Sequence, residues 1–107
     1  MRNFKDYHIA KLKNPREARA YLSLALADFQ KDNDAESFLL AIRDVAQAQG
    51  GIGKLAQETR LNRQNLYKAL SKQGNPQLET ISVVLRGLGF RLSVEPLKEF
   101  NRLSAAN

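Results

Sequence analysis

The chain has 107 residues, a formal net charge of +6 and a pI near 9.9. It contains no cysteine, which excludes disulfides and thiolate metal sites. No apolar run reaches the roughly 20 residues of a membrane span, and the N-terminus lacks the apolar stretch of a signal peptide. We therefore expect a soluble cytoplasmic protein without a membrane partner, folded as a single domain over residues 1–107.

Two longer helices are predicted in the first half of the chain. Asn14 is a suitable N-cap, Pro15 suits the first helical position, and apolar residues recur at helical spacing as far as Phe29. Asp34 is a suitable cap for a second helix with one apolar face, and the glycine pair 50–51 ends it.

Shorter helices follow. The pattern predicts one helix over residues 52–59 and another over residues 63–71, with Asn62 as the cap of the second. Residues 75–76 restart a helix whose buried side begins at Leu78, and glycines near residue 88 mark its end.

In the C-terminal tail the spacing of apolar residues changes from a helical period to a period of two. Phe90, Leu92 and Val94 alternate with polar residues, which is strand spacing, and Pro96 closes the run. Because a buried strand cannot leave its backbone groups unpaired, its partner is either the N-terminal stretch around residues 7–9 or the same strand in a second copy. The second alternative makes Phe90, Leu92 and Val94 a dimer contact.

The two short helices between Ile52 and Ser71 have the spacing of a helix-turn-helix. Such helices cross steeply only where a small side chain lies between them, and Ala56 fits that position. Leu61 directs the turn into the core, and Leu66 anchors the second helix. We expect the second helix to project a polar face from the bundle.

That polar face carries residue types that recognise DNA bases. Arg63, Gln64, Asn65 and Lys68 lie toward the exposed side and N-terminal end of the second helix. Arginine pairs with guanine, and glutamine or asparagine with adenine, when such a helix enters the major groove. The alternative is an ordinary solvated face, but the basic excess over residues 52–73 favours DNA binding.

These elements together predict an all-α fold. We expect a compact bundle of five to six helices with a helix-turn-helix, which resembles the lambda-repressor type, and a short C-terminal β-strand. It comprises an N-terminal extension with one helix (residues 1–33), the helix-turn-helix bundle (34–90), and a strand and tail (91–107).

Residues 35–90 resemble the Xre/Cro type of helix-turn-helix found in phage repressors and bacterial regulators. More narrowly, nearly the whole chain resembles the addiction-module antidote proteins, or HigA-like antitoxins. The segments that carry this second resemblance are 66–71, the Gly74-Asn75-Pro76 turn, 85–92, 41–46, and 14–15 with 21–22.

The resemblance implies a DNA-binding antitoxin of a type II toxin–antitoxin module, which neutralises a small basic RelE-like toxin and represses its own operon. A lone motif buries little surface, so a homodimer reading two half-sites is expected. By position in the motif, Lys54 and Lys72 contact flanking phosphates, while Tyr67 either touches the DNA backbone or packs on the bundle. The candidate DNA-binding set is Lys54, Asn62, Arg63, Gln64, Asn65, Tyr67, Lys68 and Lys72.

One position departs from the family pattern. Arg60 stands in the turn where the family usually carries glycine. If that backbone is left-handed, a side chain costs on the order of 1 kcal/mol. Arg60 alternatively offers an additional phosphate contact.

An acidic stretch lies between the two longer helices. Asp32, Asp34 and Glu36 lack the glycine and terminal glutamate of a calcium loop, and they suit a solvated helix start. A sharper hypothesis is that they face a basic toxin. His8, the only histidine, has no ligand-spaced partner, and no nucleophile setting or phosphate loop is present. We therefore expect no catalytic residue, no metal, no cofactor and no enzymatic activity.

Two other functions remain open at this point. The first is a stand-alone or phage-derived transcriptional regulator without a toxin. The second is a protein-binding helical module whose motif does not bind DNA. A toxin gene beside this one separates the first from an antitoxin, and the salt dependence of DNA binding separates the second.

Overall fold

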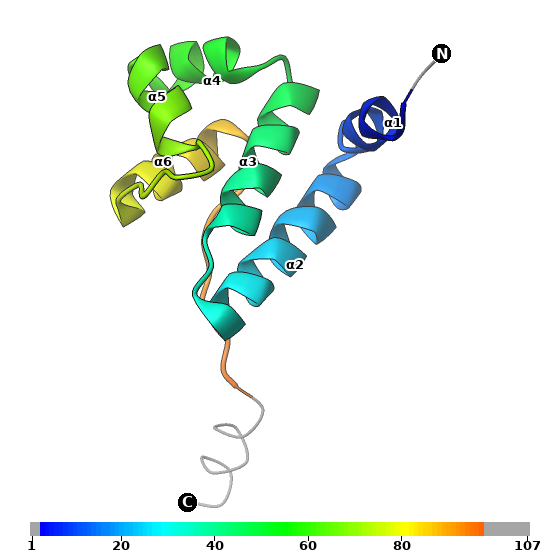
Figure 1. Ribbon diagram of the computed structural model, residues 1–107, viewed down its shortest axis with the longest axis vertical. Helices are drawn as coiled ribbons and strands as arrows, with labels where there is room; N and C mark the ends of the chain where they lie inside the picture. The colour runs from blue at the N-terminus through cyan, green and yellow to red at the C-terminus, as the bar shows by residue number, and fades with distance from the viewer. Residues whose placement is uncertain (1–2, 98–107) are drawn as a thin grey trace, which may run out of the picture.

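A computed structural model describes residues 3–97, which form six α-helices (Figure 1). The all-α class and the upper predicted number of helices are confirmed for this part of the chain. The helices are α1 (Phe4–Lys11), α2 (Pro15–Asp32), α3 (Glu36–Ala48), α4 (Ile52–Thr59), α5 (Arg63–Ala69) and α6 (Leu78–Gly87).

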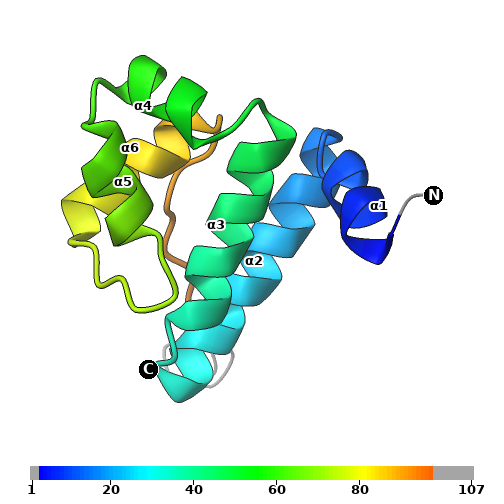
Figure 2. The same ribbon diagram turned by 45° about the horizontal axis from the view of Figure 1, so that its top comes forward.

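Helix α3 lies in the middle of the molecule. Helix α2 runs antiparallel along one side of it, and α4, α5 and α6 lie on the other side (Figure 2). Apolar residues lie around much of the circumference of α3, so this helix is buried both toward α2 and toward α4, α5 and α6. Its buried apolar residues are Phe38, Leu39, Ala41, Ile42, Val45 and Ala46.

Local signals set the bounds of α2 as predicted. The Asn14 side chain accepts a hydrogen bond from the backbone N–H of Arg16 at 2.9 Å, and α2 ends at Asn33 in a left-handed conformation, φ 59°. The cap predicted at Asp34 is one residue early, because the N-cap of α3 is Ala35, and the Asp34 carboxylate accepts a hydrogen bond from the N–H of Glu36. Beyond α3, Gly50 has φ 118°, and the N–H of Gly51 donates to the Ala46 carbonyl at 2.8 Å. This glycine turn redirects the chain into α4.

The contact between α4 and α6 requires a glycine. A Cβ on Gly87 would lie 2.6 Å from Cγ2 of Thr59 and 2.8 Å from Cδ1 of Leu55. The missing side chain lets α6 approach α4 closely and close the second half of the core. None of the helices between residues 3 and 97 is both long and apolar enough to cross a lipid bilayer.

A buried carboxylate joins the first three helices. Asp44 of α3 is 8% exposed, accepts a 2.8 Å hydrogen bond from the Tyr21 hydroxyl, and lies 3.5 Å from Nε2 of His8. The His8 and Tyr21 rings meet edge to face, with centroids 4.7 Å apart. His8 therefore packs on Tyr21 and lies beside Asp44, and it holds α1 against the bundle.

This cluster makes stability depend on pH in the alkaline range. Burial, followed by the hydrogen bond to Asp44, raises the pKa of Tyr21 above the ordinary tyrosine value of about 10. Because the pKa of Tyr21 is higher in the folded protein than in the unfolded one, the stability that protonated Tyr21 contributes is fully present below about pH 10. It is lost as pH rises toward the folded pKa. Tyr21→Phe is expected to remove the part of the decline in the free energy of unfolding that Tyr21 causes above pH 10, as measured by urea titrations. Tyr67→Phe, at an exposed ring, should leave that decline unchanged. An unchanged decline in Tyr21→Phe would contradict the assignment.

Three further predictions at the ends of elements are wrong. Residues 4–11 form a helix, capped by the Asn3 side chain on the N–H of Asp6 at 2.8 Å, so the N-terminal extension has two helices and offers no strand. Helix α6 begins at Leu78 and not at 75–76. Leu78 is 71% exposed because the first residue of the helix lies beyond the core.

The predicted C-terminal β-strand is also absent from the described residues. Phe90 and Leu92 are partly buried against the core of their own chain, whereas Val94 is 98% exposed. The physical reason is the helical N-terminus, which leaves this segment no partner within residues 3–97. The apolar residues after Pro96 predict that Leu97, Phe100 and Leu103 extend the core. Leu97 is 70% exposed, so that prediction is wrong for it, and Phe100 and Leu103 lie outside the described residues.

A candidate nucleic-acid interface

Helices α4 and α5 pack through small and aliphatic residues. Leu55 and Ala56 of α4 are buried, as is Leu66 of α5, and Leu61 in the turn is packed against the same core. The inward positions predicted for Ala56, Leu61 and Leu66 are confirmed. This packing fixes α5 at an edge of the molecule with one side free.

The free side of α5 is polar and open to solvent. Arg63, Gln64, Asn65 and Lys68 are all exposed. Asn62 caps the helix as predicted, since its side-chain oxygen accepts a hydrogen bond from the N–H of Asn65 at 2.9 Å. The structure thus brings the predicted base-reading residues together on one accessible surface, which we call the α5 face.

Tyr67 and Arg63 lie side by side on the α5 face. The Arg63 guanidinium carbon lies 5.6 Å from the centre of the Tyr67 ring, which is a cation–π distance. Arg63 also lies close to α4, since a Cβ on Gly53 would be 3.5 Å from that carbon, an ordinary van der Waals distance. Tyr67 is 49% exposed, so it packs on Arg63 while keeping part of its ring accessible.

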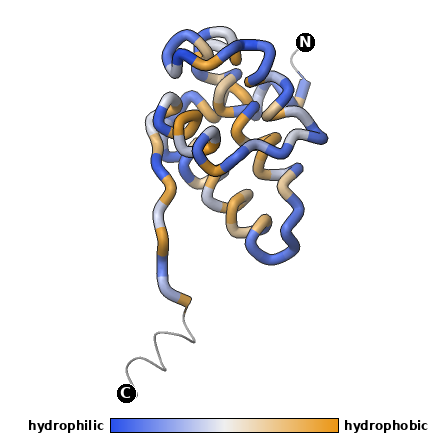
Figure 3. Tube along the Cα trace, turned by 90° about the vertical axis from the view of Figure 1, so that its left-hand side faces the viewer, coloured by the Kyte–Doolittle hydropathy of each residue, from blue (hydrophilic) through white to orange (hydrophobic). Residues whose placement is uncertain are grey.

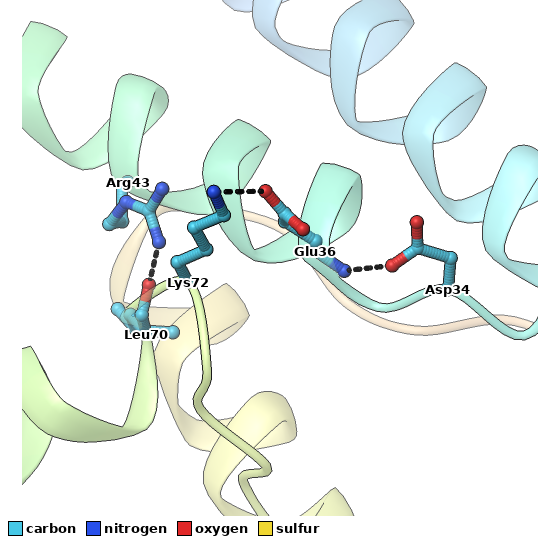
Figure 4. Close-up of polar contacts among 5 residues, drawn as sticks. All are labelled: Asp34, Glu36, Arg43, Leu70 and Lys72. Carbon is cyan, nitrogen blue, oxygen red and sulfur yellow. Dashed lines mark hydrogen bonds and ion pairs between the residues drawn. The ribbon is translucent and has the colours of Figure 1, made fainter.

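The two predicted phosphate-contacting lysines each have an acidic neighbour. Lys54 lies 4.0 Å from Glu58 within α4, and Lys72 lies 3.8 Å from Glu36 of α3 (Figure 4). All four side chains are about half exposed or more, so these ion pairs contribute little stability and break readily. Both lysines remain accessible to an anion.

Arg43 of α3 is a positioning residue that the sequence did not reveal. Its guanidinium donates a hydrogen bond to the backbone carbonyl of Leu70, at the C-terminal end of α5 (Figure 4). The last carbonyls of a helix lack partners within it, and a cation suits them. The two residues are 27 positions apart in sequence, so no local pattern indicates the contact.

A shallow groove of about 470 Å³ lies beside the α5 face, between α5 and the loop that leads to α6. Asn65 and Lys68 line it from the helix, and Gln73 and Asn75 line it from the loop. The loop returns very close to α5, because a Cβ on Gly74 would lie 2.0 Å from the Ala69 carbonyl oxygen. The groove adds amide side chains to the surface that the sequence predicted.

The acidic residues lie together in the turn between α2 and α3. Asp32 accepts a hydrogen bond from the N–H of Asp34 at 2.9 Å, and Asp34 accepts one from the N–H of Glu36 at 3.0 Å. All three side chains are exposed. The carboxylates of Asp32 and Asp34 thus organise the start of α3, and all three side chains remain exposed; we call this surface the acidic turn.

Arg60 has a left-handed backbone, with φ 61° and ψ 22°, which is one of the two alternatives that the sequence left open. A side chain in this conformation is strained. Arg60→Gly is therefore expected to raise the free energy of unfolding by about 1 kcal/mol, measured by urea titration. Arg19→Gly, at an exposed position inside α2, should lower it by a similar amount. Equal effects of the two substitutions would contradict strain at residue 60.

The chain is thus a small all-helical protein that presents a basic, amide-rich face on a short helix. The family described as "Probable addiction module antidote protein" matches residues 3–96, and the chain belongs to this family. Membership indicates an antitoxin role and implies a toxin partner in general. The resemblance to the addiction-module antidotes is confirmed.

The chain is 35% identical over 92 residues to an uncharacterized protein of Haemophilus influenzae (strain ATCC 51907 / DSM 11121 / KW20 / Rd), a match that covers 85% of this chain and 90% of that protein. No solved structure matches the chain.

Proposed function

We propose that this antitoxin binds double-stranded DNA with α4 and α5 and represses its own operon. The observation that carries the proposal is the division of α5 into a buried side, anchored by Leu66, and an exposed side with Arg63, Gln64, Asn65 and Lys68. In a helix-turn-helix of the Xre/Cro type, the N-terminal end of such a helix enters the major groove. The function is binding alone, without catalysis or a cofactor.

The protein acts as a homodimer in this proposal. A single helix of seven residues presents few base contacts, and two copies reading half-sites about one DNA turn apart multiply them. The net charge of +6 supports association with phosphate, because each phosphate neutralised releases condensed counterions.

An electrophoretic shift assay on the promoter of its own operon tests DNA binding. The association constant should fall steeply as salt rises from about 50 to 200 mM, and a scrambled duplex should bind more weakly at every salt concentration. If promoter and scrambled duplexes bind alike, or neither shifts, the motif does not read DNA. The protein would then be a protein-binding helical module.

The toxin in this proposal is a small basic RelE-like protein that docks on the acidic turn. The exposed carboxylates of Asp32, Asp34 and Glu36 form a local negative surface on a chain that is otherwise basic. Complementary charge favours fast encounter with a basic partner. Co-expression with the product of the neighbouring gene, followed by a pull-down, detects the partner. Absence of any captured toxin would favour a stand-alone regulator.

The triple variant Asp32→Asn, Asp34→Asn, Glu36→Gln is expected to weaken toxin binding about tenfold, which corresponds to about 1.4 kcal/mol. Asparagine still caps a helix start, so the fold should persist. The control Asp28→Asn, Glu58→Gln, Glu79→Gln changes the same total charge elsewhere. Isothermal titration with purified toxin gives both affinities, and equal affinities would remove the acidic turn from the toxin interface.

A further inference from the structure

The segment after α6 is extended but unpaired. From Arg91 to Leu97, no backbone group bonds to another backbone group within the described residues; the last such bond runs from the N–H of Phe90 to the Leu85 carbonyl at 2.8 Å. Figure 3 shows polar and apolar residues alternating along this stretch as it leaves the helices. An exposed extended segment with free N–H and C=O groups is a template for a second strand.

A groove runs beside this segment. It has a volume of about 630 Å³ and lies between the segment and α2. Leu22, Leu26 and Phe38 contribute its apolar lining, and Arg19, Arg91 and Glu95 its charged lining. Val94 is 98% exposed, so nothing within residues 3–97 covers it. The groove and the exposed Val94 side chain together indicate an occupant that is extended and carries apolar and charged residues in alternation.

The segment Arg91-Leu92-Ser93-Val94-Glu95 is complementary to itself when it is reversed. In an antiparallel pair centred on Ser93, Arg91 of one copy lies opposite Glu95 of the other, and this charge pair occurs twice. On the opposite face of the strand, Leu92 of each copy lies opposite Val94 of the other. Opposite charges and apolar pairs both stabilise antiparallel neighbours.

We propose that two copies of this chain associate through antiparallel pairing of residues 91–95, with Ser93 on the two-fold axis. Each segment lies over the groove of the other copy, so that Val94 is covered and the free backbone groups of both copies bond to each other. The interface uses the same residues on both copies, so it closes at a dimer. This inference rests on the homodimer of the proposed function and specifies which residues form its contact. In the sequence, these residues lie far from those of the α5 face.

Cysteine cross-linking tests the register directly, because the chain has no cysteine of its own. Directly opposed residues of an antiparallel pair have Cα atoms about 4.5–5.5 Å apart, which a disulfide can span. Ser93→Cys should form a disulfide-linked dimer under mild oxidation. Ser37→Cys, at an exposed position on α3, should remain a monomer on a non-reducing gel. Cross-linking of Ser93→Cys no faster than the control would overturn the proposal.

Charge reversal tests the predicted pairs. Arg91→Glu and Glu95→Arg should each raise the dimer dissociation constant about tenfold, since each puts like charges opposite one another twice, and the double variant should restore it. Val94→Asp should also weaken the dimer, while Leu24→Asp, at a 64% exposed position on α2, should not. Sedimentation equilibrium without DNA gives these constants.

The outcomes separate this inference from the proposed function. A protein that binds its promoter specifically but stays monomeric at sedimentation concentrations overturns the dimer contact and leaves DNA binding intact. If both charge reversals leave the dimer unchanged and weaken capture of the toxin, residues 91–95 bind the toxin and the inference is wrong. A dimer that shows the predicted reversal pattern supports it even if promoter binding fails.

Discussion

Leu66→Ala is expected to lower the free energy of unfolding by about 3 kcal/mol, because the deleted atoms leave a cavity beneath α5 that the neighbouring helices fill only in part. Leu66 is 2% exposed and is the residue that holds the middle of α5 to the core. Urea titration followed by circular dichroism measures the change. The effect is large for a domain of this size, whose total stability is about 5–15 kcal/mol.

The matched control is Leu24→Ala. Leu24 is 64% exposed on α2, so the same change of side chain should alter stability by no more than about 0.5 kcal/mol. Should the two substitutions cost the same, Leu66 does not anchor α5, and the polar side of that helix would not be the side that faces away from the core.

The double variant Arg63→Ala, Lys68→Ala is expected to weaken binding to the operator by about 3 kcal/mol, roughly a hundredfold. Arg63 is expected to supply a base contact and Lys68 a phosphate contact. Arg63→Ala alone should therefore relax preference at one base position, as Gln64→Ala should at another. Lys68→Ala alone should weaken all sequences evenly and reduce the salt slope. Shift assays on a panel of single-base operator variants measure both effects.

A second double variant separates position from total charge. Arg16→Ala, Lys31→Ala removes the same charge from exposed positions on α2 and should leave sequence preference intact. The α5 face would be excluded as the DNA-reading surface if Arg63→Ala, Lys68→Ala bound the operator with the affinity of the unaltered protein.

Local signals in the sequence predicted most of the fold. Asn14 with Pro15, the glycine pair after α3, and the Asn62 cap act on neighbouring residues, so their effects can be read without knowledge of tertiary contacts. The exposed side of α5 was also predicted from a local signal, namely the spacing of its buried residues. A left-handed turn at Arg60 was one alternative that the sequence left open, and the structure has that conformation.

What the sequence could not give depends on distant contacts. The period of two from Phe90 to Val94 is real, but a strand also needs a partner, and the N-terminal stretch that could have served is helical. The hydrogen bond from Arg43 to Leu70 and the pair between Lys72 and Glu36 join residues far apart in sequence. Composition indicated neither of them.

Arg43 and Asp44 are adjacent in sequence yet bond in opposite directions, one to the end of α5 and the other to Tyr21 of α2. One turn of α3 is thus shared by both sides of the molecule. Any opening that frays this turn releases α5 and the N-terminal helices together, so the two sides should exchange amide hydrogens as one cooperative unit and not as separate ones. In this chain, the orientation of α5 is a property of the whole fold.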